Sequence, residues 1–315
     1  MELKYQTLIT ILRKSIESKR IITNKAKRLA YGTDASFYRL IPEVVVLAQS
    51  EVEVAEVLKQ ASALHIAVTF RAAGTSLSGQ AISDSVLIVA TYGWKNYTIF
   101  NKNSLITLQP GIVGSKANSL LAPYGLKIGP DPASISTAMI GGIVANNASG
   151  MCCGTAQNSY RTISDIKIIF YDGTILDTAD KKSIAQFYEN HPQLITEIAN
   201  LHSEINNDKA LYNQIKDKFK IKNTTGYSIN ALVDFDDPIE IIKHLMVGSE
   251  GTLGFISSVT LKTIVDEKHK TCTMMIFDTI KDACDATFLL KSAPVSAVEL
   301  LDRDSIRSIE NDVES

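Results

Sequence analysis

The fold class of this chain is set by a loop of small residues, Arg71-Ala-Ala-Gly-Thr-Ser-Leu-Ser-Gly-Gln80, which we call the first segment. It comes directly after an apolar run, Ile66–Phe70, that we expect to be a strand. Backbone N–H groups of such a loop can surround anionic oxygens. Gly74 and Gly79 have the spacing of a P-loop, but Gln80-Ala81 stands where a P-loop carries Lys and Ser or Thr. Taken alone, the loop is either a plain turn or a diphosphate site without nucleotide hydrolysis.

A βαβ pattern leads into the first segment. We expect a strand over Val44–Ala48, then a helix to about Ala63, then the strand before the loop. Ser50 and Glu53 form a capping box, which is typical of a helix N-terminus. The fingerprint G-x-G-x-x-G is absent, which argues against an ordinary NAD-binding Rossmann domain. Further along we expect strands around 85–90 and 104–108 and a helix across 115–122.

Two more segments are rich in small residues. The second segment, Pro130–Gly150, is dense in Gly, Ala, Ser and Asn, which let a backbone come close to a ligand. The third segment, Gly248–Ile256, reads Gly-Ser-Glu-Gly-Thr-Leu-Gly-Phe-Ile and ends a helix that Asp237-Pro238 opens. A strand over Phe255–Thr263 follows. Between these segments we expect a hairpin of 165–171 and 174–176 around an Asp-Gly turn, and helix over 183–207 interrupted at Pro192.

Composition excludes several classes of protein. The 315 residues hold 32 Lys and Arg against 34 Asp and Glu, so the basic excess of a nucleic-acid-binding protein is missing. With 45% hydrophobic residues the chain can bury a large core, and no apolar run reaches the ~18 residues of a membrane span. The four cysteines include no C-x-x-C pair and the five histidines show no metal-ligand spacing, so we expect no metal.

The two ends of the chain differ from its middle. Leu8, Ile9, Leu12 and Ile16 recur at helical spacing, which predicts an amphipathic helix with a basic, solvated face. After Val265 the pattern restarts, with strands expected over 271–277 and 295–301, a helix over 280–291 and another helix from Asp302. This last part is short for an independent core, so we expect the beginning of a domain that is cut in half.

Taken together, the order and spacing of the three segments resemble the FAD-binding oxidoreductases of the vanillyl-alcohol-oxidase/PCMH fold. The resemblance is to the D-lactate, glycolate and D-2-hydroxyglutarate dehydrogenase branch, and it covers about Leu29 to the C-terminus. Asn223–Tyr227 and Ala297–Asp302 are similar to the large members that carry an iron–sulfur extension. The resemblance implies an α+β fold: an N-terminal helical segment (1–34), a two-subdomain PCMH-type FAD-binding domain (35–264) and the start of a ferredoxin-like substrate or cap domain (265–315).

Cofactor contacts are implied residue by residue. The first segment would wrap the FAD pyrophosphate, the second would border the ribityl chain and flavin, and the third would close the pocket, with Ile256 near the adenine. The residues that this assigns to FAD are Arg71, Ala73, Gly74, Thr75, Ser76, Leu77, Ser78, Gln80, Pro130, Asp131, Ser134, Ser136, Thr137, Gly141, Gly142, Asn146, Ser149, Gly150, Glu250, Gly251, Gly254 and Ile256. No histidine falls within 71–80, so we expect FAD to be bound non-covalently.

The function implied is oxidation of a D-2-hydroxy acid to the 2-keto acid, with hydride passing to flavin N5 and electrons going on to a quinone, cytochrome or iron–sulfur partner. The alternative is an FAD-carrying subunit or fragment without its own substrate site. No residue is assigned as catalytic, and Cys152-Cys153 receives no role. We expect a cytoplasmic protein, and peripheral contact with the inner face of the membrane stays open.

Overall fold

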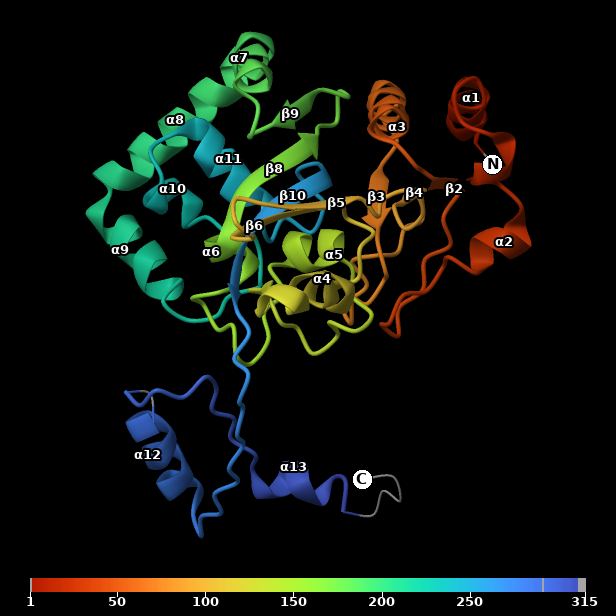
Figure 1. Cartoon of the computed structure of the whole chain (residues 1–315). Coiled ribbons are helices and arrows are strands. Elements are labelled where there is room, and N and C mark those ends of the chain that lie inside the picture. Colours follow the sequence, from red (N-terminus) through yellow and green to blue (C-terminus); the bar gives the residue numbers. More distant parts are fainter. Residues whose placement is uncertain (1, 291, 311–315) are drawn as a thin grey trace.

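Two β-sheets organise the chain, and Figure 1 shows them with the helices that cover them. The structure is a computed structural model that describes residues 2–290 and 292–310. The first sheet has the strand order β1-β2-β4-β3, with β2, β4 and β3 parallel and β1 antiparallel to β2. The second is antiparallel with the order β5-β6-β10-β8-β9, and β7 pairs with the far end of β10. The chain is therefore a mixed α+β protein, as predicted.

The elements follow one another in this order: α1 (Leu3–Leu12), the 3₁₀ turn Ser18–Arg20, β1 (Ile21–Ile22), α2 (Lys25–Leu29), β2 (Val44–Leu47), α3 (Glu51–Ala63), β3 (Val68–Arg71), β4 (Val86–Val89), β5 (Tyr97–Phe100), β6 (Leu105–Leu108), α4 (Gly114–Leu121), the 3₁₀ turn Ala122–Tyr124, β7 (Leu126–Ile128), α5 (Ile140–Asn146), α6 (Ser159–Thr162), β8 (Ile163–Ile169), β9 (Ile175–Asp177), α7 (Lys181–Asn190), α8 (Pro192–Asn207), α9 (Lys209–Lys218), α10 (Ala231–Asp234), α11 (Pro238–Met246), β10 (Phe255–Val265), α12 (Ile280–Leu290) and α13 (Arg303–Arg307).

The predicted βαβ unit forms the first sheet. The side chain of Ser50 accepts a hydrogen bond from Glu53 N and caps α3, which packs with α1 in one core over the sheet. The capping box is altered, because Glu53 Oε2 accepts a hydrogen bond from Gln49 N (2.8 Å). The same carboxylate also accepts hydrogen bonds from both terminal nitrogens of Arg20 (2.6 Å each). β3 begins at Val68 and not at Ile66. Its last residue is the first of the small-residue loop.

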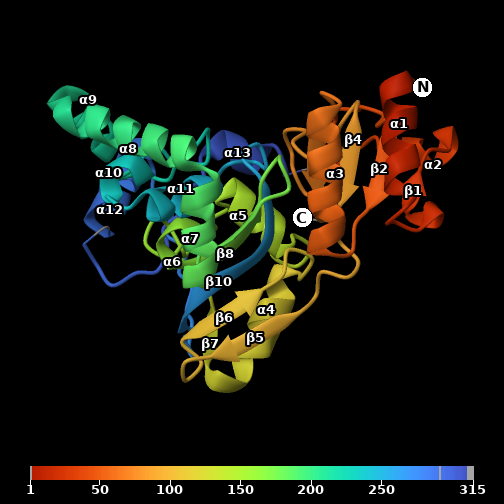
Figure 2. The same cartoon turned by 90° about the horizontal axis from the view of Figure 1, so that it is seen from above.

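The second sheet carries most of the helices. α4, α5 and α7–α11 pack with β6, β8 and β10 in a second core. The predicted hairpin is confirmed as β8 and β9 around Gly173, which has φ +85°. β5 was not predicted, because Tyr97, Thr98 and Phe100 are exposed and give no buried alternation. Figure 2 shows the first sheet with α1 and α3 on one side of the molecule and the second sheet on the other.

The chain beyond β10 corrects two predictions. α12 and α13 form as expected, but the described residues in 271–277 and 295–301 form no strand. A strand needs a neighbour for its backbone hydrogen bonds, and neither range pairs with another part of the described chain. Met274 and Ile276 are accordingly exposed. Figure 1 shows this part leading away from the two sheets. Within residues 2–290 and 292–310, no helix has the length and apolar character needed to cross a bilayer.

Candidate functional site

A cavity of about 420 Å³ brings the three segments together. Phe70 at the end of β3 and Phe255 at the start of β10 both line it, so residues from each sheet meet there. The predicted residues that line the cavity are Arg71, Ala73, Gly74, Thr75, Ser76, Leu77, Ser78, Gln80, Ser134, Gly141, Gly142, Asn146, Ser149, Glu250, Gly251, Gly254 and Ile256. Segments nearly two hundred residues apart in the sequence thus form one wall.

Five predicted residues do not line this cavity: Pro130, Asp131, Ser136, Thr137 and Gly150. Asp131 instead holds the second segment in shape, because its Oδ1 accepts hydrogen bonds from Gly150 N (3.0 Å) and Cys153 N (3.2 Å). A Cβ at Gly150 would stand 1.8 Å from the Asp131 carbonyl oxygen. This glycine is therefore required by packing within the segment.

The first segment is anchored by its arginine. Arg71 Nη1 donates to the carbonyl oxygens of Thr33 (2.7 Å) and Tyr31 (3.3 Å), and burial lowers the pKa of the guanidinium. Gly74 has φ +72°, and a Cβ there would lie 2.7 Å from the Arg71 guanidinium. The Gly74 carbonyl accepts from Ala35 N (3.0 Å). Arg71 thus positions the loop through hydrogen bonds from its guanidinium to backbone carbonyls. A side chain at Gly74 would disturb both the guanidinium and the conformation of the loop.

The third segment is attached to the end of α5. Glu250 N donates to the Ala145 carbonyl (2.8 Å), and Asn146 Nδ2 donates to Glu250 Oε1 (2.5 Å). Glu250 has φ +53°, a left-handed conformation that a non-glycine residue seldom adopts. Burial raises the pKa of its carboxyl group, against the opposing hydrogen bond from Asn146. The cavity therefore contains a strained, half-buried acid whose pKa is raised by burial.

Aromatic rings join the two halves beside the cavity. The ring of Phe255 lies 5.2 Å from that of Phe70 and 5.2 Å from that of Trp94. Trp94 Nε1 donates to the Ala48 carbonyl (2.8 Å), so this buried indole is held just after the end of β2. The three rings pack the second sheet against the first, and two of them, Phe70 and Phe255, give this side of the cavity an apolar wall.

A fourth wall comes from the connecting loop, residues 219–230, between α9 and α10. Lys222 and Thr224 line the cavity, and Lys222 Nζ donates to the Ser149 carbonyl (2.6 Å). Tyr227 hydrogen-bonds Thr252 through their hydroxyl groups (2.8 Å). The sequence offered only the resemblance at 223–227 as a signal. The other lining residues that it did not single out are Phe70, Ala72, Ala81, Ala90, Pro110, Pro132, Ala138, Met139, Ile143, Ala145, Ala148 and Phe255.

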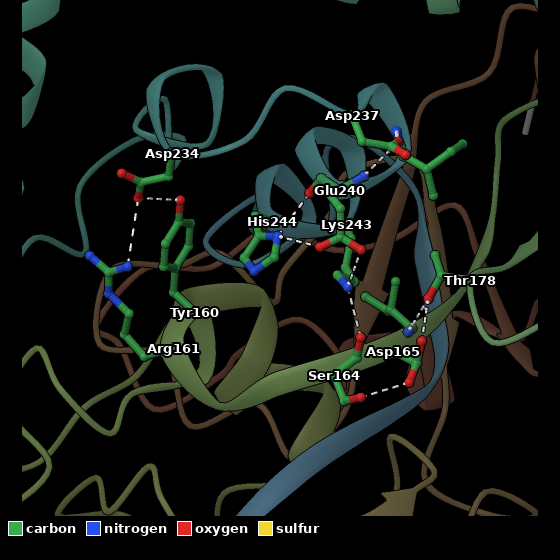
Figure 3. Close-up of polar contacts among 12 residues, drawn as sticks. Tyr160, Arg161, Ser164, Asp165, Thr178, Asp234, Asp237, Glu240, Lys243 and His244 are labelled. Carbon is green, nitrogen blue, oxygen red and sulfur yellow. Dashed lines mark hydrogen bonds and ion pairs between the residues drawn. The ribbon is translucent and has the colours of Figure 1, made fainter.

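The histidines lie elsewhere. None is among the cavity-lining residues, and the described part of the chain holds no group of three or more His, Cys, Asp or Glu that could bind a metal. His244 belongs to the polar contacts of Figure 3, between α11 and β8. Its ring stacks on Phe235 (3.9 Å between centroids), and burial lowers its pKa to about 4. Neighbouring Lys243 donates to the Ser164 carbonyl (2.7 Å), so this cluster fastens a helix to the sheet.

Comparison with known proteins identifies a domain. Residues 42–179 match the family model of an FAD binding domain. The D-2-hydroxyglutarate dehydrogenase of Haemophilus influenzae is 24% identical over 305 residues, which cover 93% of this chain and 29% of that protein. The mitochondrial D-lactate dehydrogenase (cytochrome) 1 of Saccharomyces cerevisiae is 28% identical over 275 residues, covering 85% and 38%. The chain thus spans well under half the length of these relatives.

Solved structures share the fold. An alkyldihydroxyacetonephosphate synthase superposes with a TM-score of 0.56 at 15% identity, over 84% of this chain and 42% of that one. The BBE-like 1 protein of Physcomitrella patens gives 0.55 at 12% identity, over 82% and 44%. Residues 42–179 thus match an FAD binding domain, and the chain shares the fold of these solved structures over more than four fifths of its length.

The walls of the cavity suit FAD. Gly142 lines the cavity, and a Cβ built there would have no atom within 4 Å, so the space beside this backbone is open. The hydroxyls of Thr75 and Ser78 and the backbone amides of residues 75–77 supply donors for a diphosphate, whereas the Ser76 hydroxyl is engaged within the segment by Gln80 and by Ser78 N (3.1 Å).

Proposed function

We propose that this FAD binding domain holds FAD in the cavity and serves the oxidation of a D-2-hydroxy acid to its 2-keto acid. The observation that carries the proposal is the meeting of three sequence-distant segments around one cavity. Support for the substrate class comes from the names of the relatives, which are dehydrogenases of D-2-hydroxyglutarate and D-lactate. The chemistry that FAD supplies when bound is the acceptance of a hydride.

The work of the chain is binding and placement. In the proposal, amides and hydroxyls of Gly74–Ser78 hold the diphosphate, and the open backbone at Gly142 admits the cofactor closely. Asn146 keeps Glu250 fixed at the wall. Phe70 and Phe255 exclude water. The roles of the five predicted residues outside the cavity wall are then indirect, through the shape of the second segment.

Attachment in this proposal is non-covalent. No histidine or cysteine is among the cavity-lining residues, so the described walls offer neither side chain for a covalent bond to flavin. Acid or heat denaturation should release FAD intact into the supernatant. Flavin that stayed with the precipitated polypeptide would contradict this point while leaving FAD binding itself in place.

Anaerobic bleaching of bound flavin tests the reaction. D-lactate, glycolate and D-2-hydroxyglutarate are added in turn to the FAD-loaded protein. L-lactate, the enantiomer of D-lactate, is the stereochemical control. Bleaching by one D-acid and not by L-lactate supports the proposed oxidation. A chain that binds no FAD under any condition would overturn it.

A second candidate function is FAD carriage without a complete substrate site. It is favoured by the residues that line the cavity. Among the described lining residues Glu250 is the one acid, and no histidine is present as a base. Stable FAD binding with no bleaching by any of the three acids would support this reading over the first. In either case we propose that electrons leave to a quinone, cytochrome or iron–sulfur partner in the cytoplasm or at the membrane surface.

A further inference from the structure

The connecting loop places a lysine in the cavity wall. Lys222 Nζ donates to the Ser149 carbonyl at 2.6 Å, and both residues line the cavity. Tyr227 and Ser228 fix the same loop, through the hydroxyl of Thr252 (2.8 Å) and the carbonyl of Val247 (2.6 Å). The lysine is therefore held between the second and third segments and does not depend on the first.

The ammonium group of Lys222 keeps binding capacity. It carries three N–H donors, of which the Ser149 carbonyl takes one. It forms no ion pair within the part of the chain that the structure describes, whereas nearby Lys220 pairs with Asp217 at 2.7 Å. Arg71, the other cation among the described lining residues, donates to the carbonyls of Tyr31 and Thr33. Lys222 is thus the cation of the cavity that is left to a ligand.

A second observation points the same way. Ser149 is 9% exposed, and its hydroxyl has no hydrogen-bond partner. A buried hydroxyl is normally satisfied, and an unsatisfied one beside a cavity indicates a missing ligand or water. A serine hydroxyl turns about a single bond, so it can donate to a group bound next to the lysine. The pair offers a charged donor and a neutral donor from one wall.

We propose that Lys222 and Ser149 form the subsite that binds the carboxylate of the 2-hydroxy acid, an inference that rests on the proposed function. That function brings two anionic groups to the cavity, the FAD diphosphate and the substrate carboxylate. The first segment supplies the amides and hydroxyls for the diphosphate, and Lys222 contacts the end of the second segment instead. A charge-assisted hydrogen bond to a carboxylate is among the stronger polar contacts in proteins.

Oxalate binding to the FAD-loaded protein tests the proposal without turnover. Oxalate carries the carboxylate of a 2-hydroxy acid but has no hydrogen to give up, and its binding is followed by the change in flavin absorbance. Lys222→Gln should weaken oxalate binding by about tenfold or more, since hydrogen bonds to charged groups contribute ~1.5–3 kcal/mol. Lys222→Arg should stay within a few-fold of the wild type. The matched control is Lys220→Gln, because Lys220 is an exposed lysine on the same loop. This substitution should leave the affinity for oxalate unchanged.

The FAD dissociation constant of each variant separates the possible failures. The proposal expects Lys222→Gln to keep FAD affinity, with circular dichroism showing an intact fold. Loss of FAD affinity with unchanged oxalate binding to the loaded fraction would assign the lysine to the diphosphate and overturn the proposal. Wild-type protein that binds FAD but not oxalate would overturn it as well. Absence of FAD binding in the wild type would instead refute the proposed function.

Discussion

Gly142 lies in the first turn of α5 with open space where a side chain would begin. Alanine there meets no protein atom within 4 Å and removes the entropy cost of glycine in a helix, which reaches ~1 kcal/mol. We therefore expect Gly142→Ala to leave the free energy of unfolding of the cofactor-free protein unchanged or raised. In the proposed site the same methyl group takes space that FAD would fill, so FAD affinity should fall, and it should fall further in Gly142→Val.

Flavin titration and denaturant unfolding measure the two effects on the same samples. Cys153→Ser is the control, because Cys153 is buried outside the cavity lining and should retain full flavin content. Gly74→Val is a less clean test, since its positive φ and its contact with the Arg71 guanidinium would also damage the loop. Undiminished FAD binding by Gly142→Val would remove this residue from the proposed contacts.

At the level of single residues, the sequence singled out the small residues of the cavity wall, and it did not single out the apolar residues between them or the connecting loop. Small residues such as Gly74 and Gly142 stand out in a sequence because few other positions tolerate or need them. Lys222 has no such signal: an isolated lysine between two helices looks like any solvated charge. Only the folded chain brings it to Ser149, 73 residues earlier. Gly150 is a different case: it also stands out as a small residue, but it lies against Asp131 and does not line the cavity.

Among the elements, α11 is held to its surroundings by a buried histidine, and burial favours its neutral form. His244 stacks on Phe235, contacts the edge of Tyr160 (4.8 Å between ring centroids) and donates from Nδ1 to the Glu240 carbonyl at 2.8 Å. Burial lowers its pKa from 6.5 to about 4. Between these two values the unfolded chain binds a proton that the folded chain does not, so stability falls as pH falls.

This difference predicts a loss of about 2 kcal/mol between pH 7 and pH 5 from His244 alone. His244→Asn keeps a donor for the Glu240 carbonyl but does not titrate. We expect it to be less stable than the wild type at pH 7, because the stacking is lost, and to show a smaller further loss at pH 5. Urea unfolding at both pH values measures this. The exposed His269→Asn should behave as the wild type, and an equal acid loss in His244→Asn would contradict the assignment.

The elements that the sequence predicted best are those with their own local signals. α3 and α11 carry side-chain caps at Ser50 and Asp237, and the β8–β9 hairpin has its Asp-Gly turn. β5 and β7 lack such signals, because they are stabilised by pairing with β6 and β10. The strands expected over 271–277 and 295–301 show the converse. Their sequence pattern suits a sheet, but no described strand pairs with them, so they do not form.

On the scale of the whole molecule, the cavity depends on how the two sheets are joined. Phe255 packs between Phe70 and Trp94, and Ser257 Oγ donates to Glu51 Oε1 (2.9 Å) where β10 meets α3. β10 is therefore both the central strand of the second sheet and the link to the first. The first residues of β10, Phe255 and Ile256, also belong to the third segment and line the cavity. Folding of the second sheet and formation of the cavity are therefore coupled.

This arrangement predicts that the part after β10 is dispensable for FAD binding. All cavity-lining residues precede Ser257, and the buried core ends at Leu261. A chain ending at Val265 keeps the pairing of β10 with β6, β7 and β8. We expect it to bind FAD within about twofold of the full chain and to melt within ~2–4 °C of it, the shift that ~1 kcal/mol causes in a protein of this size. A chain ending at Ser258 is the control, and it should fail to fold because the central strand is cut. Lost FAD affinity in the chain ending at Val265, with its fold intact by circular dichroism, would show instead that residues 266–315 help to build the cofactor site.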